Sequence, residues 1–357
     1  MIRIARLLLS AAAGLLSGCS TVSFYWQAVA GQMEVTRLAR PIDEVLSDPQ
    51  TPADLRRRLE YAQRAREFAS SALGLPDNAS YRRYADLRRP YVVWNVFSAP
   101  EDSLKLRTHC FPVAGCVVYR GYFAQAAAEA EAAALRAQGL DVYVGGVPAY
   151  STLGWFADPL LNSFIRYPDL EIARLVFHEL AHQVAYVGDD STFNESLAVA
   201  VEQAGLARWM DANASVADRA GYAAFAQRRR SLTHLFMAAR RDLGAAYGAQ
   251  SDAGAKRAAK ARVLGRLADE YAALKATWTL SEAQTRAYDD FVLKDLNNAK
   301  LASIATYTQR VAQFSALLAG VGGDLPRFYA EARRLAALDK TERNRQLDQL
   351  APLAKED

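Results

Sequence analysis

Residues 177–183 read Phe-His-Glu-Leu-Ala-His-Gln, with two histidines four apart and a glutamate directly after the first. Residues four apart lie above one another on the same face of an α-helix. His178 and His182 can therefore bind one metal ion, and Glu179 projects beside the open position of that metal. The spacing predicts a helix that carries this H-E-x-x-H motif and a site for zinc.

The residues around the motif predict that its helix is buried. Asp169 suits an N-cap, Gly188 suits a C-terminal stop, and the run from Leu170 to Val187 contains no Gly or Pro. Apolar residues occur on nearly every face of this run, which is typical of a buried helix. Buried histidines and glutamates need polar partners, because unsatisfied buried polar groups are costly. A zinc ion would meet that need.

A carboxylate for the same metal is expected from the next helix. We expect Gly188-Asp189-Asp190 to form a turn, followed by a second apolar stretch that forms a helix. Ser191 or Thr192 can be the N-cap of that helix. The short connection favours an antiparallel helix pair, which would bring Glu195 back over the histidines. We assign Glu195 as the third zinc ligand, because catalytic zinc usually has three protein ligands and one open position.

Glu202 lies seven residues after Glu195 and thus on nearly the same line of this second helix. Two interpretations are open: Glu202 orients a ligand histidine through a hydrogen bond, or it forms an ordinary ion pair. We also expect Asn194, directly before Glu195, to support the ligands from outside the metal site.

The N-terminus resembles a bacterial lipoprotein signal. Two arginines precede an apolar run, Leu7 to Leu16, that is too short to span a membrane, and Ser17-Gly18-Cys19 follows. The resemblance implies cleavage before Cys19 and lipid attachment to that residue. Ser20, in place of the aspartate associated with inner-membrane retention, implies an outer-membrane protein that faces the periplasm. Plain secretion or an uncleaved anchor is the alternative.

Two further cysteines, Cys110 and Cys116, remain for the mature chain. An even number of cysteines in an oxidising compartment favours a disulfide between them. The alternative is a metal site with His109, although the paired C-x-x-C spacing of structural zinc is missing.

The charge of the chain speaks against a nucleic-acid partner, and its size allows a large hydrophobic core. The formal charge of +4 includes two arginines of the signal, so the mature chain is close to neutral. No basic stripe is interleaved with aromatic residues, and we therefore expect no nucleic-acid partner. A mass of 39.2 kDa allows a substantial core, in one large domain or two lobes.

The chain divides into four expected parts: a signal (1–18), an N-terminal helical segment (19–90), a catalytic core with a small sheet and the H-E-x-x-H helix (91–210), and a helical C-terminal subdomain (211–357). Strands are predicted at 91–97, 117–119 and 140–144, and helices at 53–73 and 124–138. An apolar helix up to about residue 39 would seat the protein near the membrane or line the cleft. Breaks in the helical half fall near 211–215, 248–254 and 320–324.

Several separate motifs resemble one family. They are His109–Cys116, Tyr119–Phe123, Tyr150–Phe156, His178–His182, Asn194-Glu195-Ser196 and Asn297-Asn298-Ala299. Over nearly the whole mature chain the sequence is similar to the predicted aminopeptidases, a family of zinc lipoproteins of proteobacteria.

The H-E-x-x-H motif followed by N-E-x-x-A also resembles the gluzincin metallopeptidases, whose third ligand is a glutamate from a downstream helix. This resemblance implies an α+β, predominantly α-helical fold, with a small mixed sheet before the zinc helix and a helical C-terminal half. It also implies that residues 145–156 form the edge and loop of the cleft, where a substrate backbone pairs as an added strand.

Together these features predict a zinc-dependent peptidase of the cell envelope, specifically an aminopeptidase, with peptides as substrates and Glu179 as the general base. The oxyanion would be stabilised by Tyr150, Tyr307 or His234, and the sequence does not choose among them. The alternatives are an envelope endopeptidase and a client-binding lipoprotein with little hydrolytic activity. Glu179 speaks against the second, because a structural zinc site has no need of a glutamate there.

Overall fold

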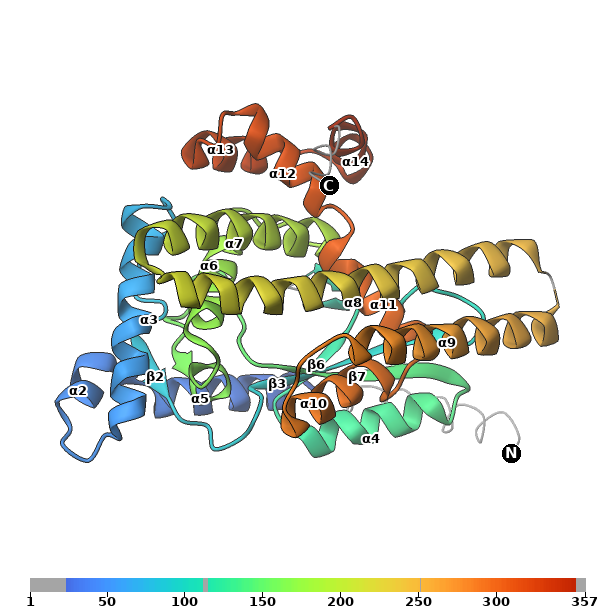
Figure 1. The fold of residues 1–357 in the computed structure, drawn as a ribbon, viewed down its shortest axis with the longest axis horizontal. Coiled ribbons are helices and arrows are strands. Elements are labelled where there is room, and N and C mark those ends of the chain that lie inside the picture. The colour runs from blue at the N-terminus through green and yellow to red at the C-terminus, as the bar shows by residue number, and fades with distance from the viewer. Residues whose placement is uncertain (1–23, 112–114, 251, 351–357) are drawn as a thin grey trace, which may run out of the picture.

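A computed structural model describes residues 24–111, 115–250 and 252–350. The expected signal and Cys19 lie outside these residues. The described chain is α+β and predominantly helical, with small sheets before the H-E-x-x-H helix and a helical C-terminal half (Figure 1). This part of the fold prediction is confirmed, whereas the gluzincin-like assignment and the division into four parts stay predictions.

The sheets lie in the first half of the chain. One antiparallel sheet has the order β6 (Arg120–Tyr122), β3 (Val93–Pro100) and β7 (Leu140–Val147), so β7 is an edge strand. A mixed sheet consists of β1 (Arg40–Pro41), β2 (Arg83–Ala85) and β8 (Leu160–Leu161). A hairpin is formed by β4 (His109–Phe111) and β5 (Gly115–Val117).

Helices enclose these sheets. In the first half they are a helix over residues 24–38, α2 (Ile42–Ser47), α3 (Ala53–Ser71), α4 (Gln125–Arg136), α5 (Asn162–Ile165), α6 (Asp169–Ala181) and α7 (Ser191–Asn213). In the second half they are α8 (Val216–Ala249), α9 (Ala253–Ala276), α10 (Glu282–Leu293), α11 (Asn298–Thr308), α12 (Val311–Gly320), α13 (Leu325–Ala336) and α14 (Lys340–Asp348). The ends of α7, α8 and α12 fall at the predicted breaks. None of the described helices is both long enough and apolar enough to cross a membrane.

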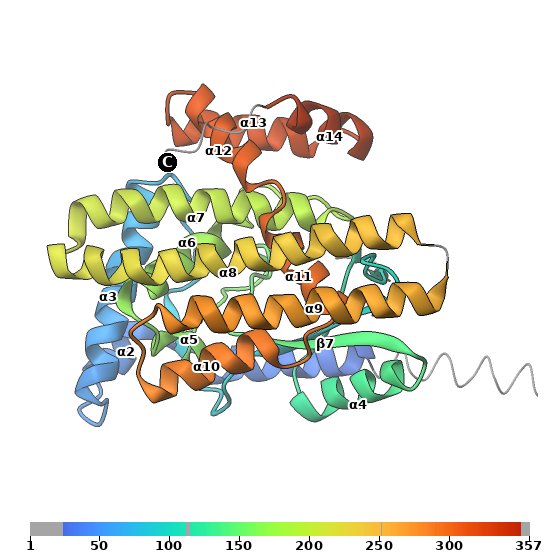
Figure 2. The same ribbon diagram turned by 45° about the vertical axis from the view of Figure 1, so that its right-hand side comes forward.

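Both ribbon views show α7 and the long α8–α9 pair stacked above the sheet and α4, with α12, α13 and α14 grouped at the far side of α7 (Figures 1 and 2). The main core lies between α3, α6, α7 and α13, where Phe177, Phe193 and Phe328 are almost fully buried. A second core lies between α8, α9 and α10 around Phe236 and Tyr271. The helix α6 is thus central, and only its Asp169 and Arg174 are not buried.

The predicted ends of α6 and α7 need correction. The H-E-x-x-H helix ends at Ala181 rather than Val187, because the chain turns at residues 182–184 to enter a short link to α7. Pro168 precedes the first turn in place of a capping side chain, while Asp169 pairs with Arg57 at 2.8 Å. Asp190 caps α7, not Ser191 or Thr192: its carboxylate accepts the N–H of Phe193 and also pairs with Arg343 of α14 at 2.9 Å.

Two neighbouring asparagines fix α11 on the sheet. Asn297 caps α11 by accepting the N–H of Lys300, and it donates to the carbonyl of Val142 in β7 at 2.9 Å. The fully buried Asn298 donates to the carbonyls of Pro100 and Glu101 and accepts from the hydroxyl of Tyr247. The Asn297-Asn298 motif therefore sets the position of α11 relative to β3 and β7.

We predict that Asn298→Ala lowers the free energy of unfolding by about 2–3 kcal/mol, because two carbonyls and a hydroxyl lose their partner at a buried place. Denaturant unfolding followed by circular dichroism measures this. The matched control is Asn213→Ala, since Asn213 is exposed at the end of α7 and makes one hydrogen bond to Trp209. Equal losses in the two variants would contradict the role given to Asn298.

Candidate metal centre

Three side chains from α6, its C-terminal cap and α7 meet at one point. The Nε2 atoms of His178 and His182 are 3.2 Å apart. Oε2 of Glu195 is 3.5 Å from Nε2 of His178 and 3.8 Å from Nε2 of His182. The two histidines are buried and Glu195 is partly buried. Two segments joined by a short link thus bring all three expected ligands together, and this group could bind a metal ion.

The donor set fits a tetrahedral ion. Nitrogen and oxygen ligands about 2.0–2.2 Å from a zinc ion are about 3.3–3.6 Å from one another in a tetrahedron. The three observed separations lie close to this range. Oε2 of Glu195 is also buried without a hydrogen-bond partner among the described residues, which is costly for a carboxylate oxygen unless a cation lies beside it.

Glu202 lies directly behind this group. Its carboxylate accepts the Nδ1–H of His178 at 2.9 Å and pairs with Arg174 at 2.6 Å, and its other oxygen is 3.5 Å from Arg229. The contact at Nδ1 directs Nε2 of His178 toward Glu195 and His182, where a metal ion could replace the proton on that nitrogen. Glu202 thus bonds to a histidine and forms ion pairs, and both interpretations of its role stay open.

Burial and charge shift the protonation of these groups. Burial raises the pKa of Glu202, but Arg174 and His178 outweigh it and lower this pKa to about 2. Burial likewise lowers the pKa of His178, yet Glu195 and Glu202 raise it to about 10. Burial lowers the pKa of His182 to about 4, which keeps its lone pair free near neutral pH. Burial, with the charge of Glu195, raises the pKa of Glu179 to about 7.

Tyr307, on α11, faces the carboxylates of the site. The charge of Glu195, followed by burial, raises the pKa of the Tyr307 hydroxyl well above its usual value, and Glu179 adds to the effect. This hydroxyl therefore remains a hydrogen-bond donor. The other two candidates lie elsewhere: the hydroxyl of Tyr150 donates to Oε1 of Gln32, and His234 is exposed on α8.

Several residues near the site were missed from the sequence, among them Tyr119 and Asp158. Tyr119 lies between β5 and β6, and burial together with Glu195 and Glu179 raises its pKa. Asp158 is buried; both of its oxygens accept hydrogen bonds from Thr152 at 2.8 Å, and burial raises its pKa to about 6. The run Tyr119–Phe123 could have signalled the first, whereas nothing in the sequence distinguishes Asp158.

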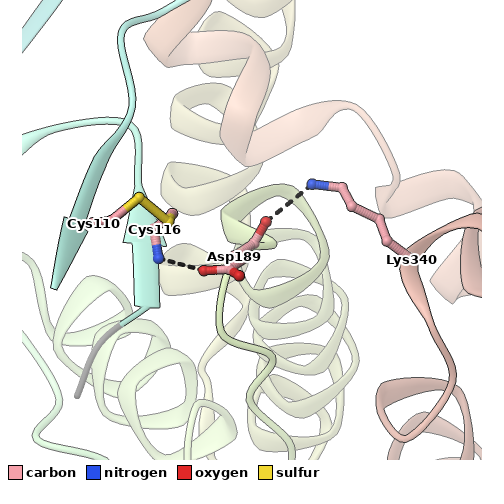
Figure 3. Close-up of a disulfide and its surroundings, with 4 residues drawn as sticks. All are labelled: Cys110, Cys116, Asp189 and Lys340. Atoms are coloured by element: carbon pink, nitrogen blue, oxygen red, sulfur yellow. Dashed lines mark hydrogen bonds between the residues drawn. A yellow bond between two sulfur atoms is a disulfide. The ribbon is translucent and has the colours of Figure 1, made fainter. Parts of the chain in front are cut away.

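The link between α6 and α7, residues 182–190, is held by contacts with several other segments. The side-chain amide of Asn194 exchanges two hydrogen bonds of 2.8 Å with the backbone of Val187 and so holds this segment. Cys110 and Cys116 form a disulfide, which excludes them as metal ligands beside His109. The N–H of Cys116 donates to the carboxylate of Asp189 within the link (Figure 3).

The hairpin that carries the disulfide and the helix α14 both form hydrogen bonds with Asp189 of the link. Lys340 of α14 donates to the carbonyl of Asp189 at 3.0 Å, opposite Cys116 (Figure 3). Gly115 has φ +70°, and a Cβ there would lie only 2.7 Å from Oδ1 of Asp189. A glycine is therefore required for the hairpin to approach the link.

The expected cleft edge adjoins the same region. Gly145 and Gly146 pair with Asn95 and Trp94 on one side of β7, whose other side has no strand in the described sheet. The chain then continues to Gly154, which packs against Gln183, the residue after His182.

A known protein family matches most of the chain. Residues 23–347 match a family described as "Putative aminopeptidase". The chain belongs to this family. No curated protein and no solved structure matches the chain.

We predict that Glu202→Gln weakens zinc binding about 10- to 100-fold, because the carboxylate that orients His178 loses its charge. Titration against a competing chelator measures the affinity. Glu129→Gln, at an exposed position of α4, is the matched control and should bind zinc as the unmodified chain does. Unchanged affinity in Glu202→Gln would mean that Glu202 acts only as a partner of the arginines.

Proposed function

We propose that the protein is a zinc-dependent aminopeptidase of the cell envelope, of the gluzincin type. The observation that carries this proposal is the convergence of His178, His182 and Glu195 on one point, with Glu179 next to them on the same helix. Membership of an aminopeptidase family supports peptides as substrates.

His178, His182 and Glu195 would hold the zinc ion. When bound, zinc supplies Lewis acidity, which polarises a peptide carbonyl and lowers the pKa of water. Glu179 takes a proton from the attacking water and delivers it to the amine that leaves. Its buried position suits this task, because a carboxylate with a raised pKa can both accept and return a proton near neutral pH.

Tyr307 would donate a hydrogen bond to the carbonyl oxygen as negative charge develops there. Its position beside Glu195 and Glu179 supports this assignment over Tyr150 and His234. A hydroxyl that stays protonated is an effective donor, and α11 is a rigid support because Asn297 and Asn298 fix it to the sheet.

The free side of β7 would bind the substrate backbone as an added strand. Gly145 and Gly146 lie in this strand, and the ring of Tyr91 occupies the place that a side chain at Gly146 would take. The loop that follows would close the cleft near Gln183.

The location belongs to the same proposal. A lipid on Cys19 would anchor the protein to the outer membrane with its body in the periplasm. The disulfide of Cys110 and Cys116 supports an oxidising compartment, since such bonds persist there and are rare in the cytosol.

We predict that Glu179→Gln loses at least about 100-fold in peptide hydrolysis while its zinc content stays the same. The glutamine keeps the size of the side chain but cannot accept the proton. Zinc analysis and hydrolysis of an unblocked peptide library measure the two quantities, with Glu129→Gln as the control. A fully active Glu179→Gln protein would contradict the mechanism.

Comparing free with N-acetylated peptides tests the exopeptidase assignment. We expect cleavage of peptides with a free amino terminus only, and loss of this cleavage in Glu179→Gln. Cleavage of both peptide sets would identify an endopeptidase that uses the same residues. Stoichiometric zinc without any cleavage would favour a client-binding lipoprotein instead.

A further inference from the structure

The helix over residues 24–38 has an apolar outer face. Trp26, Val29 and Met33 are 71%, 52% and 66% exposed. Their spacing of three and four residues places them on one stripe of the helix. A helix that packs on a protein body ordinarily turns polar residues to solvent. Contiguous exposed apolar side chains of this size are typical of an interaction surface.

The opposite face of this helix is fixed to the protein body. Val35 is fully buried, and the amide of Gln27 donates to the carbonyl of Gly121 in β6 at 3.2 Å. Glu34 pairs with Arg89 at 2.8 Å. Because these contacts already hold the inner face, the stripe is a permanent outer surface of the folded chain.

The chemistry of the stripe fits a lipid bilayer. Tryptophan favours the boundary between lipid and water, where its ring is in the apolar layer and its N–H remains hydrated. The exposed Arg37 follows Met33 by four residues on the same line of the helix, and guanidinium groups bind anionic lipid head groups. Apolar and basic positions therefore follow one another along a single face, as in helices that lie in a membrane surface.

The covalent chain places this face near the expected anchor. Residue 24 is five residues from Cys19, and a chain of that length spans at most about 18 Å. A lipid on Cys19 would thus hold the start of the helix close to the bilayer. We propose that Trp26, Val29 and Met33 form a membrane-docking face that enters the lipid surface, with Arg37 among the head groups.

This face would orient the protein on the membrane. The helix lies along the lower side of the molecule in both ribbon views, where it is drawn in dark blue, and α12, α13 and α14 lie on the opposite side (Figures 1 and 2). The proposal goes beyond the hydrolytic function, since none of the docking residues belongs to the metal centre.

Tryptophan quenching in vesicles tests the proposal. The full chain, purified from membranes, is reconstituted in phosphatidylethanolamine–phosphatidylglycerol vesicles with and without brominated acyl chains. Trp26→Phe is compared with Trp155→Phe, because both tryptophans are exposed and only Trp26 lies on the face. We expect the bromine-dependent quenching to fall at least about twofold in Trp26→Phe and to persist in Trp155→Phe.

A double variant, Val29→Glu with Met33→Glu, should also reduce the quenching of Trp26 at least about twofold, because charged side chains oppose insertion. Its peptide hydrolysis in detergent should equal that of the unmodified chain, which separates this test from the proposed function.

Three outcomes would overturn the proposal. A chain that does not float with vesicles overturns the anchor and the docking face together. Flotation with equal quenching in Trp26→Phe and the unmodified chain overturns only the face. Self-association in detergent that the double variant abolishes, again without quenching of Trp26, would assign the stripe to a second copy of the chain.

Discussion

The contact between α6 and α7 through Glu202 is the interaction on which the site depends. An ionised carboxylate in such a buried place is tolerated only with close partners, because its transfer out of water is costly. Arg174, one turn before His178, supplies that partner at 2.6 Å and is itself held by Glu171 at 2.8 Å. The same carboxylate directs the ring of His178. One carboxylate thus both balances charge inside the helix pair and orients a histidine of the candidate metal centre.

Residues that are distant in sequence hold the link between α6 and α7 and the helix α11 in place. The link between α6 and α7 carries Asp189 and Asp190, and these acidic residues are held by Cys116, Lys340 and Arg343. The α11 helix reaches the site only because Asn297 and Asn298 bond to strands about 150 to 200 residues earlier. Local sequence places the histidines, whereas long-range polar contacts fix the distances between the site and its surroundings.

This difference explains which features the sequence predicted. Helical spacing alone predicts that His178, Glu179 and His182 lie together. The segment between α6 and α7 is short, so the start of α7 must lie near the end of α6, and this places Glu195 beside the histidines. The predicted end of the H-E-x-x-H helix at Val187 and the predicted cap of α7 at Ser191 or Thr192 were both wrong: α6 ends at Ala181, and Asp190 caps α7. Asp190 also pairs with Arg343, a tertiary partner that no local pattern indicates. The choice of Tyr307 over Tyr150 likewise rests on the placement of α11, which no local pattern indicates.

The contacts of the helix over residues 24–38 join the outer surface to the catalytic region. Gln27 bonds to β6, and Gln32 accepts from the hydroxyl of Tyr150, which precedes the loop beside Gln183. The first is a contact between a side chain and the backbone, and the second joins two side chains directly. Any surface that holds the outer face of this helix therefore also sets the orientation of the loop beside Gln183. In the proposed lipid-anchored peptidase, that orientation would decide whether peptides reach the metal centre from the membrane surface or from the surrounding solution.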